Sequence, residues 1–102
     1  MLWLISRLRV VVDSYSDFLK EQSKIKPHMV RQLQTVFGAF VRGNNPRKAL
    51  PVMKQNDRQI AHQLAEHYGL DSASYDPEPK RNVVIFKSDF KRARIPTPLL
   101  LP

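Results

Sequence analysis

Arg58 and His62 lie four positions apart in the stretch NDRQIAHQLAEHYG, a spacing that makes their side chains neighbours on a helix surface. An arginine guanidinium is a rigid fork of donors that suits phosphate. A histidine can donate a hydrogen bond, stack its ring on a base or carry charge at mildly acid pH. Arg58 also lies in the first helical turn, where free backbone N–H groups favour anions. The pair indicates a phosphate or nucleotide contact; the alternative is two solvated surface residues with no special role.

Two further basic pairs lie in segments whose composition predicts loops. Lys80 and Arg81 follow a proline turn, and Arg47 and Lys48 follow an Asn-Asn-Pro loop. Each pair could extend a basic surface around Arg58, with ordinary loop solubility as the alternative. Lys and Arg outnumber Asp and Glu by 17 to 9 in the 102 residues, and the formal net charge is +8. This balance favours an anionic partner such as nucleic acid.

Several kinds of chemistry lack the residues that they require. The chain has no cysteine, which excludes disulfides, thiolate nucleophiles and cysteine-ligated zinc. His28 and His67 have no companions at metal-site spacing, and no glycine-rich phosphate loop is present. Glu66, one turn after His62, could orient that histidine for catalysis on nucleic acid, but nothing positions a nucleophile. We therefore expect no enzymatic activity, no cofactor and no bound metal.

The elements that must position these residues begin with two helices. Residues 14–24 predict a short helix capped by Ser14 or Ser16. A second helix begins at Pro27, where the missing N–H costs nothing, and ends at Gly43. Its apolar residues recur at helical spacing: Val30, Leu33, Phe37, Phe40 and Val41.

A third helix carries the Arg58–His62 pair. Asn56 is its expected N-cap, and Gly69 is expected just beyond its end. The apolar stripe of this helix consists of Ile60, Ala61, Leu64 and Tyr68. Arg58 and His62 lie off that stripe, so we expect both to be exposed, and we expect His67 on the exposed side as well.

Three strands complete the pattern. Residues 49–53 predict a short edge strand, since Pro51 is tolerated only at a sheet edge. Residues 71–76 alternate in polarity, and residues 81–87 contain the unbroken run VVIF. A short proline-bearing turn joins the last two strands, which favours an antiparallel pair. Tyr68 and Tyr75 are expected in the core.

The region from Ala49 to Lys87 resembles an R-3-H domain, a family named for an arginine and a histidine separated by three residues. Arg58-Gln-Ile-Ala-His62 matches that motif, and HQLAEHYGL, a serine-containing strand and EPKRNVVIFK follow in the family's order. YDPEPKRNVV resembles the form found in the nuclear NFX-type zinc-finger transcription factors, including the shuttle-craft-like members. The upstream segment YSDFLKEQSKIKPHMVRQLQTVFGAFV is similar to the helical stretch that precedes the domain there.

The resemblance implies an α+β fold in which helices pack on one face of a small, three-stranded, mainly antiparallel sheet, preceded by a helical N-terminal extension. It implies a module that binds single-stranded RNA or DNA through an exposed Arg58 and His62, with Lys80 and Arg81 at basic positions nearby. It also implies a nuclear setting, with the cytoplasm as a second location. The family's zinc-finger array is not carried over, because this chain has no cysteine.

We therefore predict an N-terminal helical extension (1–45), a nucleic-acid-binding domain (46–90) and a basic, proline-containing tail (91–102). No membrane contact is expected, since the apolar run Met1–Ile5 is too short for a signal-peptide core or a membrane span. The function expected is single-stranded nucleic-acid binding in a transcriptional or RNA-regulatory protein. The alternative is a protein-interaction module that uses the upstream helices and the apolar ends MLWLI and PLLLP.

Overall fold

The computed structural model describes residues 13–102, and the apolar run Met1–Ile5 lies outside the described residues. The elements follow the predicted order of two helices, a strand, a helix and two strands. Their bounds are α2 Asp17–Ile25, α3 Pro27–Arg42, β1 Arg47–Val52, α4 Gln55–His67, β2 Asp71–Tyr75 and β3 Asn82–Phe86.

Local signals explain where the first two helices begin and end. The Ser16 side chain caps α2 by accepting a hydrogen bond from the amide of Leu19 at 3.2 Å. Pro27 starts α3, and the amide of Gly43 bonds back to the carbonyls of Ala39 and Phe40 at its end. The cap Ser16 and both ends of α3 are confirmed, whereas α2 ends at Ile25, one residue beyond the predicted Lys24.

The start of α4 differs from the prediction. Asn56 lies inside the helix, and the capping position belongs to Lys54, which makes no side-chain capping bond. Asn56 instead donates its side-chain amide to Gln22 of α2 at 3.1 Å. The interhelical contact therefore replaces the expected cap. Gly69 follows the helix end with a φ of 67° and is the predicted terminator.

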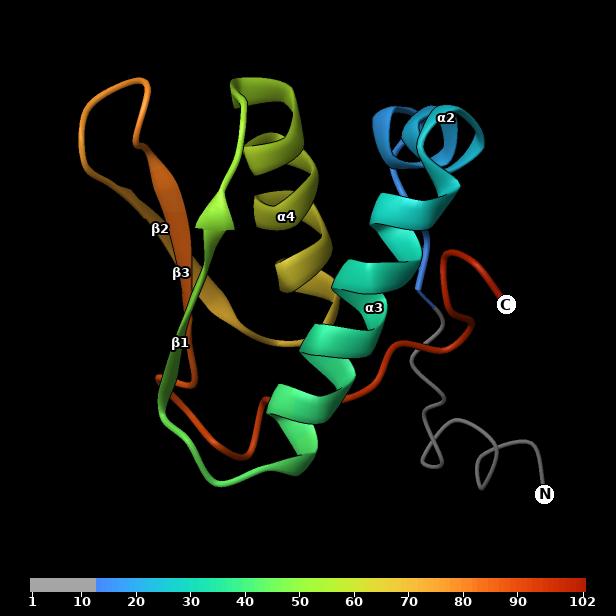
Figure 1. The fold of residues 1–102 in the computed structure, drawn as a ribbon. Helices are drawn as coiled ribbons and strands as arrows, with labels where there is room; N and C mark the ends of the chain where they lie inside the picture. The colour runs from blue at the N-terminus through green and yellow to red at the C-terminus, as the bar shows by residue number, and fades with distance from the viewer. Residues whose placement is uncertain (1–12) are drawn as a thin grey trace, which may run out of the picture.

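The three strands form one antiparallel sheet in the order β1-β3-β2. The predicted antiparallel pair of β2 and β3 is confirmed, and β1 is an edge strand, as Pro51 indicated. The register of β1 shifts between Ala49 and Val52, which is the stretch that contains the proline. The three described helices lie on one side of the sheet: α4 lies between the sheet and α2, and α3 runs past α4 toward the start of β1 (Figure 1).

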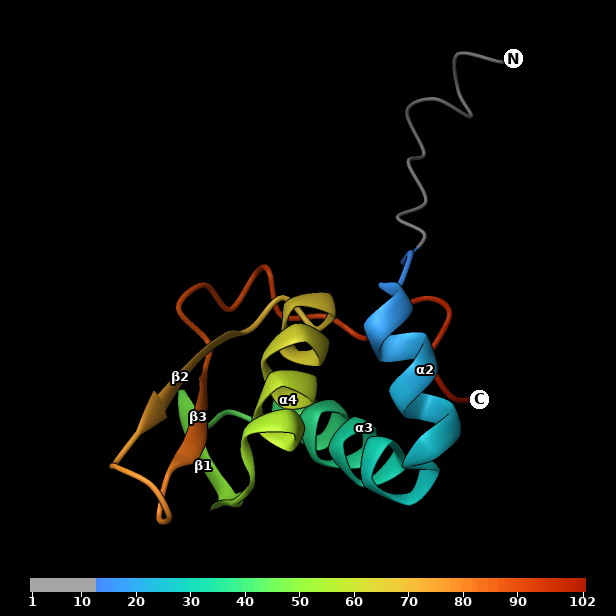
Figure 2. The same cartoon turned by 90° about the horizontal axis from the view of Figure 1, so that it is seen from above.

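One hydrophobic core joins the helices to the sheet. Ile85 and Val83 of β3 face α4, and the cluster extends through Ile60 and Leu64 to Phe37 of α3. The segment after β3 crosses from the sheet past α4 toward α2 (Figure 2). Residues from all three predicted segments contribute to this cluster or pack against it, among them Tyr15, Leu19, Val30, Leu50, Ile95, Leu100 and Leu101.

The C-terminal PLLLP run forms no regular element, but it docks on the chain itself. Leu100 and Leu101 pack against the core. The backbone N–H and C=O of Leu101 both bond to the side-chain amide of Gln34, at 2.9 and 2.8 Å. This apolar end, expected as part of a surface for a partner, is therefore largely used within the chain.

Candidate nucleic-acid interface

Helix α4 turns the Arg58–His62 side toward the sheet, contrary to the expectation that both residues are exposed. Arg58 retains 6% exposure, and His62 is partly buried between α4 and β2. The physical reason is the position of two alanines. Ala61 and Ala65 lie three and seven residues after Arg58, on the same side of the helix, and both are fully buried. Their small side chains let α4 approach the sheet closely, which brings the pair inside.

Arg58 links three parts of the fold. Its Nη1 donates to the carbonyl oxygen of Met53, just after β1, at 2.6 Å. Its Nη2 donates to the carboxylate of Glu78 in the β2–β3 turn, forming an ion pair. The side chain of Arg58 is 7% exposed, whereas that of Glu78 is 61% exposed. The guanidinium is therefore satisfied within the protein, and a carboxylate occupies its outer side.

Both ring nitrogens of His62 have partners on β2. Nδ1 lies 2.6 Å from the hydroxyl oxygen of Ser72, and Nε2 lies 2.7 Å from that of Ser74. A neutral imidazole donates through one nitrogen and accepts through the other, so the two serines take opposite roles. Burial lowers the pKa of His62, and the positive charges of Arg58 and Arg81 lower it further, against an opposing effect of Glu66. His62 is thus a neutral, fixed ring at neutral pH.

These side chains form one wall of an open cleft of about 520 Å³ between the start of α4 and the β2–β3 turn. The cleft brings Arg58 and His62 together with Arg81 and adds four residues that sequence reasoning missed. The added residues are Gln55, Gln59, Ser74 and Glu78. Gln55 and Gln59 were open to prediction, because they precede Arg58 and His62 by three residues and so lie beside them on α4.

The predicted basic positions divide between two places. Arg81 lines the cleft, and its neighbour Lys80 is exposed in the same turn. Arg47 and Lys48 instead begin β1, whose register pairs them with Phe86 and Ile85 at the opposite end of β3. The guanidinium carbon of Arg47 lies 5.4 Å from the centre of the Phe86 ring. The fold therefore does not bring Arg47 and Lys48 to the cleft.

Two other expectations on side-chain positions are wrong. Tyr75, expected in the core, is 46% exposed, because Ser74 faces α4 and the next side chain along a strand faces the opposite way. His67, expected on the exposed side, bonds through Nδ1 to the carboxylate of Asp13 at 2.8 Å, and its side chain is 20% exposed. Tyr68 is buried as expected, with 1% exposure.

The described residues hold no group of three or more His, Cys, Asp or Glu side chains that could bind a metal ion. Within residues 13–102, no helix has the length and apolar character needed to cross a membrane.

The fold and the site together define a small α+β module, with an open three-stranded sheet and an arginine–histidine pair set between its central helix and one edge strand. The chain belongs to the R-3-H domain family, whose model matches residues 28–87. This family generally consists of nucleic-acid-binding modules. The match begins near the start of α3, within the predicted N-terminal extension, and it ends just after β3.

The chain is also similar to the "FKBP12-associated protein 1 homolog" of Schizosaccharomyces pombe, with 31% identity over 93 residues. The similarity covers 91% of this chain but only 7% of that relative. The chain thus spans only a small part of the length of that relative.

Proposed function

We propose that this chain binds single-stranded RNA or DNA at the cleft between α4 and the β2–β3 turn. The observation that carries the proposal is the convergence of Arg58, His62 and Arg81 on one open cleft of about 520 Å³ in a chain of net charge +8. A cleft of this size accommodates a nucleotide unit. Its cationic wall suits the phosphate, and its amide and hydroxyl side chains suit sugar or base edges.

The buried and the exposed residues of the cleft take different roles. Arg81 and Lys80 are exposed, and they contact phosphates through charge-assisted hydrogen bonds. Gln55 and Gln59 are exposed on α4 and offer both donors and acceptors. His62 presents its ring as a fixed neutral surface, and Arg58 contacts a phosphate where that phosphate displaces the carboxylate of Glu78. Few phosphates are neutralised, so binding is weak and sensitive to salt.

The same reasoning assigns no catalytic role to His62. Its two ring nitrogens bond to serines, so neither is engaged by Glu66 as an orienting carboxylate. We further propose that the chain belongs to the NFX-type subgroup of the family, within a nuclear transcriptional or RNA-regulatory protein that also reaches the cytoplasm. The support for this subgroup is the sequence YDPEPKRNVV, which spans the β2–β3 turn beside the cleft.

The proposal is tested by fluorescence-anisotropy titration of short single-stranded RNA and DNA at several salt concentrations. Replacing buried Arg58 would confound binding with unfolding, so the variant to use is Lys80→Ala/Arg81→Ala. Losing two phosphate contacts should reduce the slope of log K against log salt by about 1.4 and weaken binding most at low salt. The matched control is Lys20→Ala/Lys24→Ala, which removes two exposed charges from α2.

Equal losses in the two double variants would assign binding to the overall charge of the chain and not to the cleft. Absence of wild-type binding at low salt would refute single-stranded nucleic-acid binding by this chain.

A further inference from the structure

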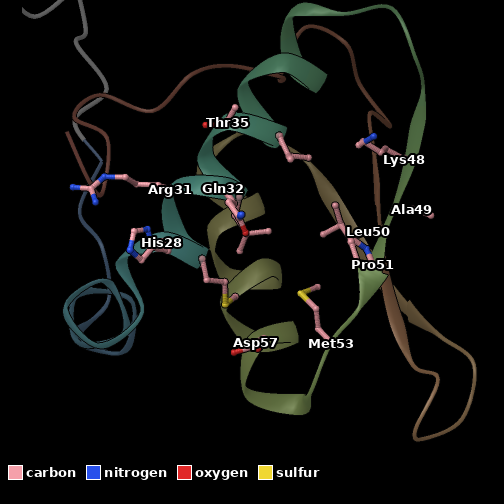
Figure 3. Close-up of a pocket in the computed structure, with 13 residues that line it drawn as sticks. His28, Arg31, Gln32, Thr35, Lys48, Ala49, Leu50, Pro51, Met53 and Asp57 are labelled. Carbon is pink, nitrogen blue, oxygen red and sulfur yellow. The ribbon is translucent and has the colours of Figure 1, made fainter.

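A second and larger cavity, of about 950 Å³, lies between α3 and β1, away from the Arg58–His62 cleft (Figure 3). Its floor is apolar and is formed by Met29, Leu33 and Val36 of α3 with Leu50 and Met53 from β1 and the residue after it. Three exposed cationic or titratable side chains, His28, Arg31 and Lys48, stand around it. We refer to this cavity as the α3–β1 groove.

One wall of the groove is the free edge of the sheet. Among the described strands, β1 pairs only with β3, and the amide of Lys87 bonds to the carbonyl of Pro46 at 2.9 Å. Because bonding direction alternates along an antiparallel strand, Lys48 also points its backbone groups to β3, whereas Arg47 and Ala49 point theirs outward. The next outward position is Pro51, which has no N–H to leave unpaired. The edge thus offers backbone donors and acceptors at Arg47 and Ala49.

We propose that the α3–β1 groove binds an extended segment of a partner protein, which adds a strand to β1 and places alternate apolar side chains in the groove. Strand addition at an exposed edge obtains affinity from backbone bonds and specificity from side-chain pockets on one face. Successive side chains of the added strand point to opposite faces. Every second residue therefore enters the apolar groove, and those between face the opposite side.

Charge determines the polar residues of that segment. Lys48 lies on the groove side of β1 and Arg47 on the other side, so both faces of this end of the strand are cationic. Among the described residues, neither Arg47 nor Lys48 forms an ion pair, whereas the one acidic lining residue, Asp57, is paired with Lys26 at 2.5 Å. The residues of the segment that alternate with its apolar side chains lie on the Arg47 side of the strand, so the segment that fits is acidic at those positions. This proposal is independent of nucleic-acid binding at the cleft.

The probes are three synthetic eight-residue peptides with valine at alternate positions and glutamate, glutamine or lysine between them. Each is titrated into the ¹⁵N-labelled 102-residue chain, and amide shifts give both the location and the affinity. We expect the glutamate peptide to bind tightest and the lysine peptide weakest, at least about tenfold apart, with the largest shifts at Arg47 and Ala49.

Two variants test the two parts of the proposal. Ala49→Pro removes an outward N–H without touching the pairing with β3 and should weaken every peptide about two- to tenfold. Arg47→Glu, on the side of the strand that the charged peptide residues face, should reverse the order of the glutamate and lysine peptides, whereas the control Lys24→Glu on α2 should not. Single-stranded RNA binding measured on the same variants should be unchanged, which also shows that they are folded.

Three results would overturn the proposal. The first is that no peptide shifts Arg47 and Ala49 at millimolar concentration. The second is that RNA shifts these amides and loses affinity in Arg47→Glu, which would show that the edge binds nucleic acid, as the basic pair Arg47 and Lys48 first indicated. The third is sedimentation of the free chain as a dimer that Ala49→Pro dissociates, because the occupant would then be a second copy.

Discussion

At the scale of single residues, Arg58 is an anchor whose outer side is already occupied by an anion. The Glu78 carboxylate binds the guanidinium where a phosphate oxygen would otherwise bind, and its side chain is 61% exposed. Pairs between two exposed partners are worth roughly 0.2–1 kcal/mol, but the guanidinium of this pair is buried and needs a counter-charge. Glu78 therefore competes with a phosphate for Arg58, and a phosphate that displaces Glu78 restores the charge pairing of the guanidinium.

Replacing Glu78 by glutamine tests this competition. Glutamine keeps an acceptor for Arg58 but removes the charge, so single-stranded RNA should bind about two- to five-fold more tightly. The measurement is anisotropy at low salt. The control is Asp76→Asn, which removes a charge from the same turn and suits the φ of 69° at that position. If both variants gain affinity equally, the effect is general charge and Glu78 has no specific role.

At the scale of elements, the end of α4 determines where the segment after β3 packs against that helix. Gly69 has a φ of 67°, and a Cβ placed there would lie 1.8 Å from the carbonyl oxygen of Arg92. Beside it, the amide of Arg94 bonds to the carbonyl of Tyr68 at 3.0 Å. The helix terminator is therefore also the point where the segment after β3 packs against α4.

Gly69→Ala should accordingly destabilise the fold by more than about 2 kcal/mol, because it adds a backbone clash to a left-handed conformation. The melting temperature should fall by at least about 8 °C. Gly38→Ala is the matched control, since its Cβ would meet the flexible end of Arg42 at 3.0 Å and lie in ordinary contact with Ile95 at 3.8 Å, and alanine favours a helix interior. A melting temperature that stays unchanged in Gly69→Ala would contradict the close approach at Arg92.

At the scale of the whole molecule, Asp13 joins both ends of the described chain to α4. Its carboxylate accepts bonds from His67 at 2.8 Å, from both terminal nitrogens of Arg94 at 2.6 and 3.0 Å, and from the amide of Thr97 at 2.9 Å. Burial alone would raise the pKa of Asp13, but these bonds together lower it from 3.8 to about 2. The carboxylate is thus strongly favoured in the folded state.

The sign of the pH dependence follows from that lowered pKa. As pH falls, the unfolded chain binds the proton at Asp13 first, so the contribution of about 2 kcal/mol is complete above pH 3.8 and is lost by about pH 2. Asp13→Asn should lower the unfolding free energy at pH 7 by at least that amount and flatten its decline between pH 4 and 2. Urea unfolding at several pH values measures both. Asp76→Asn should leave the slope as in the wild type, and an equally steep slope in Asp13→Asn would contradict this account.

The sequence by itself determined the elements and their order. The helix boundaries could be predicted where a single residue type sets them through local backbone or capping effects. These residues are Ser16, Pro27, Gly43 and Gly69. Pro51 predicted an edge strand for the same reason, because proline has no backbone N–H to donate to a second neighbouring strand. The spacing of Arg58 and His62, together with HQLAEHYGL, a serine-containing strand and EPKRNVVIFK in the family's order, was likewise sufficient to identify the family.

Only the tertiary structure decided which surfaces these residues face. Arg58 is buried because Ala61 and Ala65 allow α4 to approach the sheet, and its partner Glu78 lies twenty positions further along the chain. Lys48 lies by the α3–β1 groove and not by the cleft because β1 and β2 occupy opposite edges of the sheet. Local propensities act over a few residues, whereas burial and charge proximity depend on contacts between distant segments, and the chemistry of both surfaces depends on those contacts.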